Sequence, residues 1–252
     1  MSTEQVIVYI IAPLVAYFLG AIPFGFVIGK AHGVDIRKVG SGNIGATNLG
    51  RTLGMKYFWQ AMILDALKGF LPVFLTCLFV AHVNQHGYSV DPSQPSIFSL
   101  GPVTLRPTLY VVKVFLPSWS PLIAGVAAML GHVFPIYLKF RGGKGVATSF
   151  GVVLGLWPVY TIAGLLAGLT FVVVFMGCRY ISLSSILSSI AFMLYVIFLV
   201  TCDLPPIGHI ALSQRYPLVG IAVAFAALII IKHRSNIARL LKGTEPKWGQ
   251  KH

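Results

Sequence analysis

Long apolar runs alternate with short polar loops along this chain. The first run, Val6–Ile28, contains no charged residue, and at about 1.5 Å per residue it is long enough to cross a bilayer. Nothing basic precedes it, and its apolar part is too long for a cleaved signal peptide. The pattern therefore predicts an all-α integral membrane protein, with further runs at Tyr57–Ala81, Trp119–Tyr137, Val146–Cys178, Ile181–Val200 and Tyr216–Ile231.

The run Val146–Cys178 is longer than one crossing needs, and Pro158 interrupts it. A proline inside a helix costs about 3 kcal/mol, so we expect a turn there. The first piece, Val146–Trp157, is then a short helix that need not reach fully across the membrane.

Lysine and arginine are distributed unevenly between the loops. They are frequent after the first and third runs and in the C-terminal tail, whereas the loop 82–118 carries only Arg106 and Lys113. The positive-inside rule places the basic loops and the C-terminus in the cytoplasm and the N-terminus outside. Such a chain crosses an odd number of times, so splitting the run at Pro158 predicts a seven-helix transmembrane bundle.

Composition limits the remaining possibilities. The chain has 252 residues, 56% of them hydrophobic, and a formal net charge of +13, which suits nucleic acid, anionic lipid or an anionic substrate. We expect one membrane domain over residues 1–252, with an external insertion at about 82–118. Three scattered cysteines are too few for a disulfide framework or a metal site, and no cofactor is expected.

Two features inside the runs have a structural interpretation. The G-x-x-x-G pairs Gly25/Gly29, Gly151/Gly155 and Gly164/Gly168 are typical of close helix packing. Asp65 and Lys68 would each cost about 2.5–3.5 kcal/mol at the bilayer centre. Because they share a helix face, both a structural ion pair and a role for Lys68 in binding a phosphate stay open.

The polar residues gather in three blocks that the predicted topology places on the cytoplasmic side. The blocks are GSGNIGATNLGR at 40–51, FRGGKGVAT at 140–148 and KHRSNIARLLKGTE at 232–245. Glycine lets main-chain N–H groups converge on an anion, while lysine and arginine supply positive charge. Together they predict a shared anionic site, although a well-capped turn also explains the first block.

The second block is not a nucleotide-binding P-loop. Gly145 stands where the motif requires serine or threonine, and Leu138 stands where its first glycine belongs.

The three blocks also carry a resemblance to a known family. They contain S-G-N-x-G-x-T-N-x-x-R, then H-x-F-P and F-x-G-G-K-G-V-A-T, then H-R-x-N-I-x-R-L-x-x-G-T-E. With G-A-I-P-F-G and L-D-A-L-K-G in the first two runs, the chain resembles the bacterial acyl-phosphate:glycerol-3-phosphate acyltransferases over most of its length. The segment 82–118 is the exception.

The resemblance implies a multi-pass protein of the bacterial cytoplasmic membrane, with seven spans and an active site facing the cytoplasm. It also implies the reaction: the acyl group of acyl phosphate passes to the 1-hydroxyl of glycerol 3-phosphate, giving lysophosphatidic acid and phosphate. The expected partners are these two substrates and membrane lipid. Nucleic acid is not expected, because the basic residues are spread over membrane-flanking loops.

Each of the three blocks is expected to supply different residues of the site. Lys144 with the amides of Gly142 and Gly143 is expected to clamp a phosphate, and the first block to supply donors to the second phosphate or the acyl oxygen. The carried-over motif completes the site with His233 and Asn236, and Glu245 orients a cation or the glycerol hydroxyl. The expected catalytic residues are Ser41, Arg51, His233 and Asn236, and the expected substrate-binding residues are Asn43, Thr47, Asn48, Gly142, Gly143, Lys144, Lys68 and Glu245.

Two questions stay open. Either His233 or a substrate phosphate accepts the proton of the attacking hydroxyl. His132, in the third run, is interpreted as a buried, hydrogen-bonded histidine near the site.

Other interpretations fit less well. His86 and Asp91 match the H-x-x-x-x-D signature of thioester-dependent acyltransferases, but the predicted topology puts them outside. A transporter for a phosphorylated solute would place its polar site near the membrane midplane. Anionic-lipid binding explains the basic tail but not the Asn/Ser/Thr-rich first block.

Overall fold

A computed structural model describes residues 1–85, 119–202 and 212–249. In these residues all regular structure is helical, as the apolar runs predict. The chain divides into two compact units, Met1–Trp157 and Pro158–His252. The single membrane domain expected over residues 1–252 stays a prediction.

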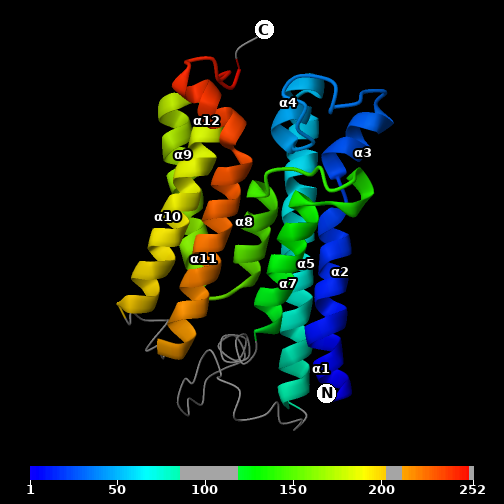
Figure 1. The fold of residues 1–252 in the computed structure, drawn as a ribbon, viewed down its shortest axis with the longest axis vertical. Helices are drawn as coiled ribbons and strands as arrows, with labels where there is room; N and C mark the ends of the chain where they lie inside the picture. The colour runs from blue at the N-terminus through cyan, green and yellow to red at the C-terminus, as the bar shows by residue number, and fades with distance from the viewer. Residues whose placement is uncertain (86–118, 203–211, 250–252) are drawn as a thin grey trace. The chain divides into compact units, whose positions relative to one another are not determined.

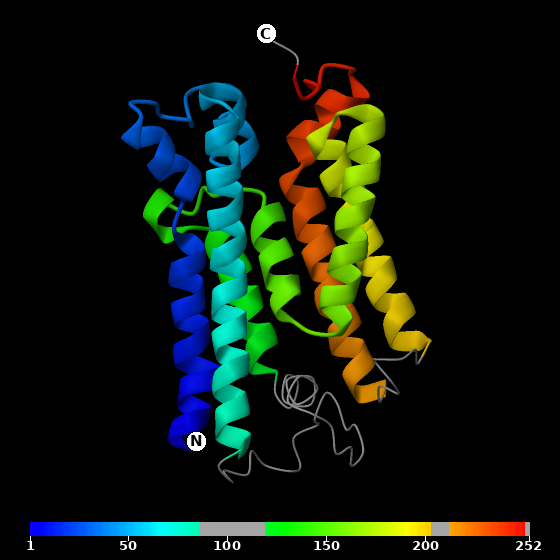
Figure 2. The ribbon, with the colours of Figure 1, turned by 180° about the vertical axis from the view of Figure 1, so that it is seen from behind.

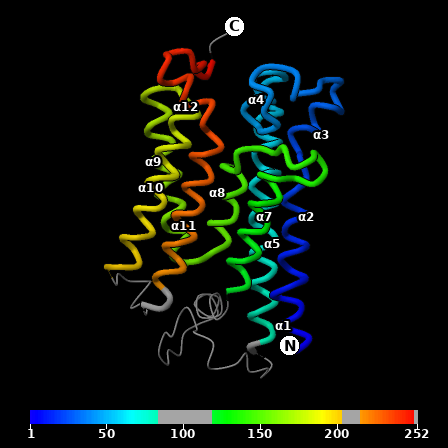
Figure 3. The backbone as a smooth tube through the Cα atoms, in the orientation of Figure 1, coloured from blue at the N-terminus to red at the C-terminus, as the bar shows by residue number. Residues whose placement is uncertain are grey.

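Three described stretches of the first unit are long enough to cross a membrane. The short helices at 24–31 and 46–53 lie at the end of this unit opposite the N-terminus (Figures 1 and 2). Its helices are α1 (Thr3–Val6), η1 (Ile7–Ile11), α2 (Ala12–Ala21), α3 (Phe24–Ala31), α4 (Ala46–Leu53), α5 (Met55–Gln85), α7 (Ser120–Val133), η2 (Ile136–Leu138) and α8 (Val146–Gly155). The chain reverses direction between α7 and α8 (Figure 3). The loops at 32–45 and 139–145 therefore lie at the same end of this unit (Figures 1 and 2).

The second unit contains α9 (Val159–Cys178), α10 (Ile181–Thr201), α11 (Leu212–Lys232) and α12 (Arg234–Leu241). The Trp248 amide donates to the Arg179 carbonyl at 2.8 Å. This bond ties the segment after α12 to the turn between α9 and α10.

Six helical stretches among the described residues are long and apolar enough to cross a membrane. They are Thr3–Ala31, Met55–Val83, Ser120–Leu138, Val159–Cys178, Ile181–Thr201 and Arg215–Lys232, and they correspond to the six apolar runs. The expected turn at Pro158 is confirmed, because α8 ends at Gly155 and α9 begins at Val159. At 10 residues, α8 is about 15 Å long.

Two boundaries differ from the sequence prediction. The first run is not one continuous helix: α2 ends at Ala21, and Pro23 precedes α3, because proline lacks the amide that a continuing helix needs. The second helix continues through Gln85, past the expected start of the insertion at His82. The rest of that segment, 86–118, with the His86–Asp91 signature, lies outside the described residues.

Glycines let the helices of the first unit approach closely. A Cβ atom on Gly151 would collide with the Ala66 carbonyl of α5, and one on Gly69 would collide with the Thr148 carbonyl of α8. Gly20 and Gly131 make the same kind of approach between α2 and α7. The expected packing role is seen for Gly151/Gly155 against α5 and for Gly25/Gly29 against the loop before α4, while Gly164 is buried in α9.

Candidate functional site

The first block folds around the buried side chain of Asn48, which is 2% exposed. Its Oδ1 accepts the Ser41 amide at 3.0 Å, and its Nδ2 donates to the carbonyls of Ile36 at 2.8 Å and Val39 at 3.1 Å. Gly40 has a φ of +56°, and a Cβ there would strike the Asn48 carboxamide oxygen. Asn48 therefore holds the loop together by bonding its backbone.

The other polar residues of this block divide into two groups. The Asn43 side chain accepts the Gly45 amide at 3.0 Å, which shapes the turn that leads into α4. Ser41 and Arg51 are exposed, and Thr47 is half-buried. The capped-turn interpretation thus describes Asn43 and Asn48, whereas Ser41 and Arg51 remain accessible to a ligand.

An apolar cluster supports this loop from beneath. Its buried members are Ile36, Ile44, Leu49 and Ala61, and Leu138 packs against them. Leu138 is the last residue of η2, just before the second block. The same apolar cluster therefore packs against segments that carry the first and the second block, both in the first unit.

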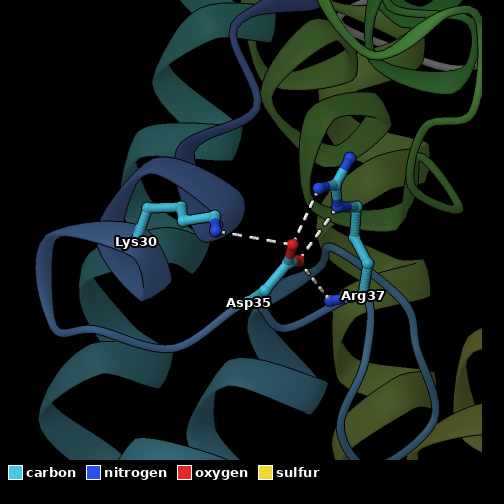
Figure 4. Close-up of polar contacts among 3 residues, drawn as sticks. All are labelled: Lys30, Asp35 and Arg37. Atoms are coloured by element: carbon cyan, nitrogen blue, oxygen red, sulfur yellow. Dashed lines mark hydrogen bonds and ion pairs between the residues drawn. The ribbon is translucent and has the colours of Figure 1, made fainter.

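The segment before the loop is held by one carboxylate (Figure 4). Asp35 accepts two hydrogen bonds from the Arg37 guanidinium, at 2.9 and 2.7 Å, and lies 3.5 Å from the Lys30 ammonium. The Arg37 hydrogen bonds keep the pKa of Asp35 well below its usual range, so the carboxylate stays ionised. The same guanidinium lies 4.5 Å from the centre of the Phe26 ring, a cation–π contact.

The second block makes a tight turn against the end of α7. The Gly143 amide donates to the His132 carbonyl at 3.1 Å, so this amide, which the sequence assigned to a phosphate, is already bonded within the protein. A Cβ on Gly142 would collide with that carbonyl, and one on Gly143 would collide with the His132 imidazole. Lys144, the next residue, is half-buried.

Asp65, Lys68 and His132 form a buried polar cluster in the first unit. The Lys68 ammonium lies 2.8 Å from Asp65 Oδ1, and His132 Nδ1 lies 3.7 Å from the same oxygen. The ammonium also donates to the Ile22 carbonyl at 2.7 Å. The side chain of Lys68 is 3% exposed and makes the ion pair that the sequence predicts as one alternative. Its role in binding a phosphate stays a prediction.

The third block, in the second unit, centres on the carboxylate of Glu245, which is 6% exposed. One of its oxygens accepts the Ser182 hydroxyl and the Asn236 carboxamide, each at 2.7 Å, and the other accepts Arg239 Nε at 2.7 Å. The expectation that Glu245 orients a cation fits the Arg239 contact. Ser182, which lies on α10, was missed because its sequence distance from the block gives no signal of contact.

His233 is 2% exposed, at the junction between α11 and α12. Its Nδ1 lies 2.8 Å from the Ile229 carbonyl. In a neutral imidazole this bond puts the proton on Nδ1 and leaves Nε2 as the acceptor. The backbone thereby fixes both the orientation and the tautomer of this ring.

The environment of Glu245 favours its ionised form. Burial raises the pKa of this carboxyl, but the hydrogen bonds from Ser182, Asn236 and Arg239 outweigh burial and hold the pKa below 4.5. A depressed folded-state pKa stabilises the fold above the unfolded pKa, and this contribution is lost as the pH falls through the folded value.

Glu245→Gln is therefore expected to loosen residues 242–249 at neutral pH, because an amide replaces one acceptor oxygen with a donor. Hydrogen exchange of that peptide, corrected for intrinsic rates, should accelerate in the variant at pH 7. In the unchanged protein the protection should persist above pH 4.5 and disappear only below it. Glu4→Gln serves as the matched control. Equal protection in both variants at pH 7 would contradict the anchoring role of Glu245.

No group of three or more His, Cys, Asp and Glu side chains that could hold a metal ion occurs within residues 1–85, 119–202 and 212–249. The donors of the three blocks are mainly amides, hydroxyls and cations. Such groups suit anionic oxygens, and the first two blocks present theirs at one end of the first unit.

Comparison with known proteins agrees with this chemistry. Residues 10–243 match the family model for glycerol-3-phosphate acyltransferase. A glycerol-3-phosphate acyltransferase of a Nostoc strain is 40% identical over 241 residues, covering 94% of this chain and 91% of the relative. One from Geobacter sulfurreducens is 38% identical over 239 residues, covering 95% of this chain and 97% of the relative.

Two crystal structures of PlsY (YgiH), an integral membrane glycerol 3-phosphate acyltransferase, resemble the present fold. The glycerol 3-phosphate form has a TM-score of 0.68 at 36% identity, covering 95% of this chain and 94% of that chain. The lysophosphatidic acid form has a TM-score of 0.66 at 34% identity with the same coverage. The chain belongs to the glycerol-3-phosphate acyltransferase family.

Proposed function

We propose that this protein transfers the acyl group of acyl phosphate to the 1-hydroxyl of glycerol 3-phosphate, releasing lysophosphatidic acid and phosphate. The observation that carries the acyltransferase activity is the family match over residues 10–243. The related crystal structures are a glycerol 3-phosphate form and a lysophosphatidic acid form, an acceptor and a product of this reaction. Acyl phosphate as the donor rests on the resemblance of the three sequence blocks.

The chemistry needs no covalent intermediate. Acyl phosphate is already an activated mixed anhydride. The acceptor hydroxyl oxygen attacks the acyl carbon, the bond from that carbon to the phosphate oxygen breaks, and the hydroxyl proton passes to a base. The protein must bring two anions together, align the hydroxyl, and stabilise the negative charge that develops on the carbonyl oxygen.

In this proposal the accessible residues of the first two blocks bind the anions. Lys144 binds a phosphate as a point charge, and Arg51 binds a phosphate or the developing oxyanion through its guanidinium fork. Ser41 and Thr47 donate from their hydroxyls. Asn43, Asn48, Gly142 and Gly143 act by shaping the two turns, as their hydrogen bonds and close contacts favour.

Residues of the third block complete the reaction. His233 accepts a hydrogen bond from a substrate hydroxyl at Nε2, Asn236 donates to a substrate oxygen, and Glu245 holds Asn236 and Arg239 in place through the hydrogen bonds described above. We assign the proton to a substrate phosphate rather than to His233. The chain has only six acidic residues, so few of its carboxylates could serve as the base, whereas each substrate carries a phosphate.

The protein is proposed to cross the bacterial cytoplasmic membrane seven times as one domain. The N-terminus lies outside, and the C-terminus and the active site face the cytoplasm. Support comes from the basic residues that follow alternate runs, and from the helix break at Pro158, which adds α8 to the six long spans.

The donor can be tested directly with purified protein in detergent. It should acylate glycerol 3-phosphate from acyl phosphate, and not from acyl-CoA or acyl carrier protein, because only the mixed anhydride presents a phosphate leaving group to the basic turns. Product formation from each donor at equal concentration is the measurement. Equal use of a thioester would overturn the donor assignment while leaving the acyltransferase activity intact.

The turns can be tested by removing their accessible groups. Lys144→Ala should raise the KM for a phosphate substrate, whereas Ser41→Ala and Arg51→Ala should each lower kcat by about 100-fold, as expected for loss of a transition-state donor. Lys38→Ala, a basic change two residues before the first block, is the matched control. Unchanged kinetics in all three variants would remove these turns from the active site.

The topology can be tested by labelling. In a protein whose native cysteines are replaced, a cysteine at Ser2 should react with an impermeant maleimide in intact cells. Cysteines at Ser41, Lys144 and Lys242 should react only after the cells are opened. Reaction of Ser41 and Lys144 cysteines from opposite sides would contradict the proposed cytoplasmic site.

A further inference from the structure

Asp65, Lys68 and His132 are three ionisable side chains that are buried together in the first unit. Their side chains are between 3% and 6% exposed, and the contacts described above join them to each other, to the Ile22 carbonyl and to the turn at Gly143. Charges in such surroundings carry a desolvation cost that apolar side chains of similar size avoid. The cluster therefore requires an explanation other than fold stability.

One end of the cluster supports the turn of the second block. His132 contacts this turn in two ways: its carbonyl accepts the Gly143 amide at 3.1 Å, and its imidazole fills the space that a side chain on Gly143 would need. Asp65 lies 3.7 Å from the imidazole Nδ1. A change in the orientation of His132 must therefore move the turn that presents Lys144.

The other end reaches the interruption between α2 and α3. There the Ile22 carbonyl accepts both the Phe24 amide, at 3.1 Å, and the Lys68 ammonium, at 2.7 Å. The ammonium also lies 5.5 Å from the centre of the Phe24 ring. Lys68 thus fixes the point from which α3 departs.

From that point α3 supports the first block. Gly25 and Gly29 of this helix pack against Ile44 and Ile36, two members of the apolar cluster beneath the loop. The buried ion pair is therefore connected to both loops at this end of the first unit, through His132 to one and through Ile22 and α3 to the other.

We infer that Asp65, Lys68 and His132 are positioning residues that hold the Lys144 turn and the loop before α4 in register with each other. The inference rests on the proposed function, since it assigns the cluster to the same reaction. Asp65 is the common neighbour: it neutralises Lys68, which holds the α2–α3 junction, and it lies 3.7 Å from the imidazole of His132, which packs against the turn. In this role the three side chains act through the two loops and not on the reacting atoms.

The first test is a double-mutant cycle between His132 and Lys144. His132→Ala should raise the KM for the same substrate as Lys144→Ala, by about 10-fold or more, as expected for a small misplacement of a binding group. Because His132 acts through the turn, adding it to Lys144→Ala should change the KM little further. If the KM increases of the two single variants multiply in the double variant, His132 acts independently of Lys144 and the inference is overturned.

The second test removes the buried charges without leaving one unpaired. The double variant Asp65→Asn with Lys68→Met is expected to fold, because replacing both partners of a buried pair is often tolerated. It should nevertheless raise the same KM and accelerate hydrogen exchange in residues 139–146. Thr76→Val, a buried polar change on the same helix, should change neither. Normal KM and normal exchange in the double variant would overturn the inference.

The two proposals fail differently. If Lys144→Ala has normal kinetics but His132→Ala accelerates exchange in residues 139–146, the binding role of the turn is wrong and the positioning role stands. If Lys144→Ala raises a KM while His132→Ala alters neither kinetics nor exchange, the positioning role is wrong.

Discussion

The ion pair between Asp65 and Lys68 answers a requirement that lipid imposes on this fold. Hydrocarbon offers no hydrogen bonds, so charged groups and main-chain carbonyls within a span must find partners in the protein. The first span is interrupted at Pro23, and Lys68 donates to the Ile22 carbonyl at that interruption. Asp65 neutralises the ammonium that makes this bond. A broken helix and a buried charge are each costly alone, and here each satisfies the other.

In the two glycine-rich loops of the first unit, polar groups also form hydrogen bonds with the protein's own backbone. Their conspicuous polar residues divide into those that build the loop and those that remain accessible. Asn48 uses both ends of its carboxamide on the loop backbone, and Gly143 gives its amide to His132. Ser41, on a loop whose shape is already fixed, and Arg51, on the helix α4 that follows it, are exposed. Such a preformed arrangement suits the proposed reaction, whose main demand is to align two anionic substrates.

The third block follows a similar design in the second unit. Glu245 accepts hydrogen bonds from α10 and α12, while the Ile229 carbonyl fixes the His233 ring. An acidic residue in a strongly basic chain thus serves to organise neighbouring donors. Asp35 does the same for Arg37 before the first loop.

The sequence alone determined the helical class, the six long apolar runs and the break at Pro158, because membrane length and proline geometry act locally along the chain. It also located the three polar blocks and, through their spacing, the family. Tertiary structure alone decided what each polar residue does. Asn48 bonds the backbone of its own loop, Lys68 meets the Ile22 carbonyl 46 positions earlier, and Ser182 meets Glu245 across 63 positions. None of these contacts follows from the local pattern of the sequence. A sequence shows which donors are present, but only packing shows whether a donor is buried against its own backbone or left accessible to a ligand.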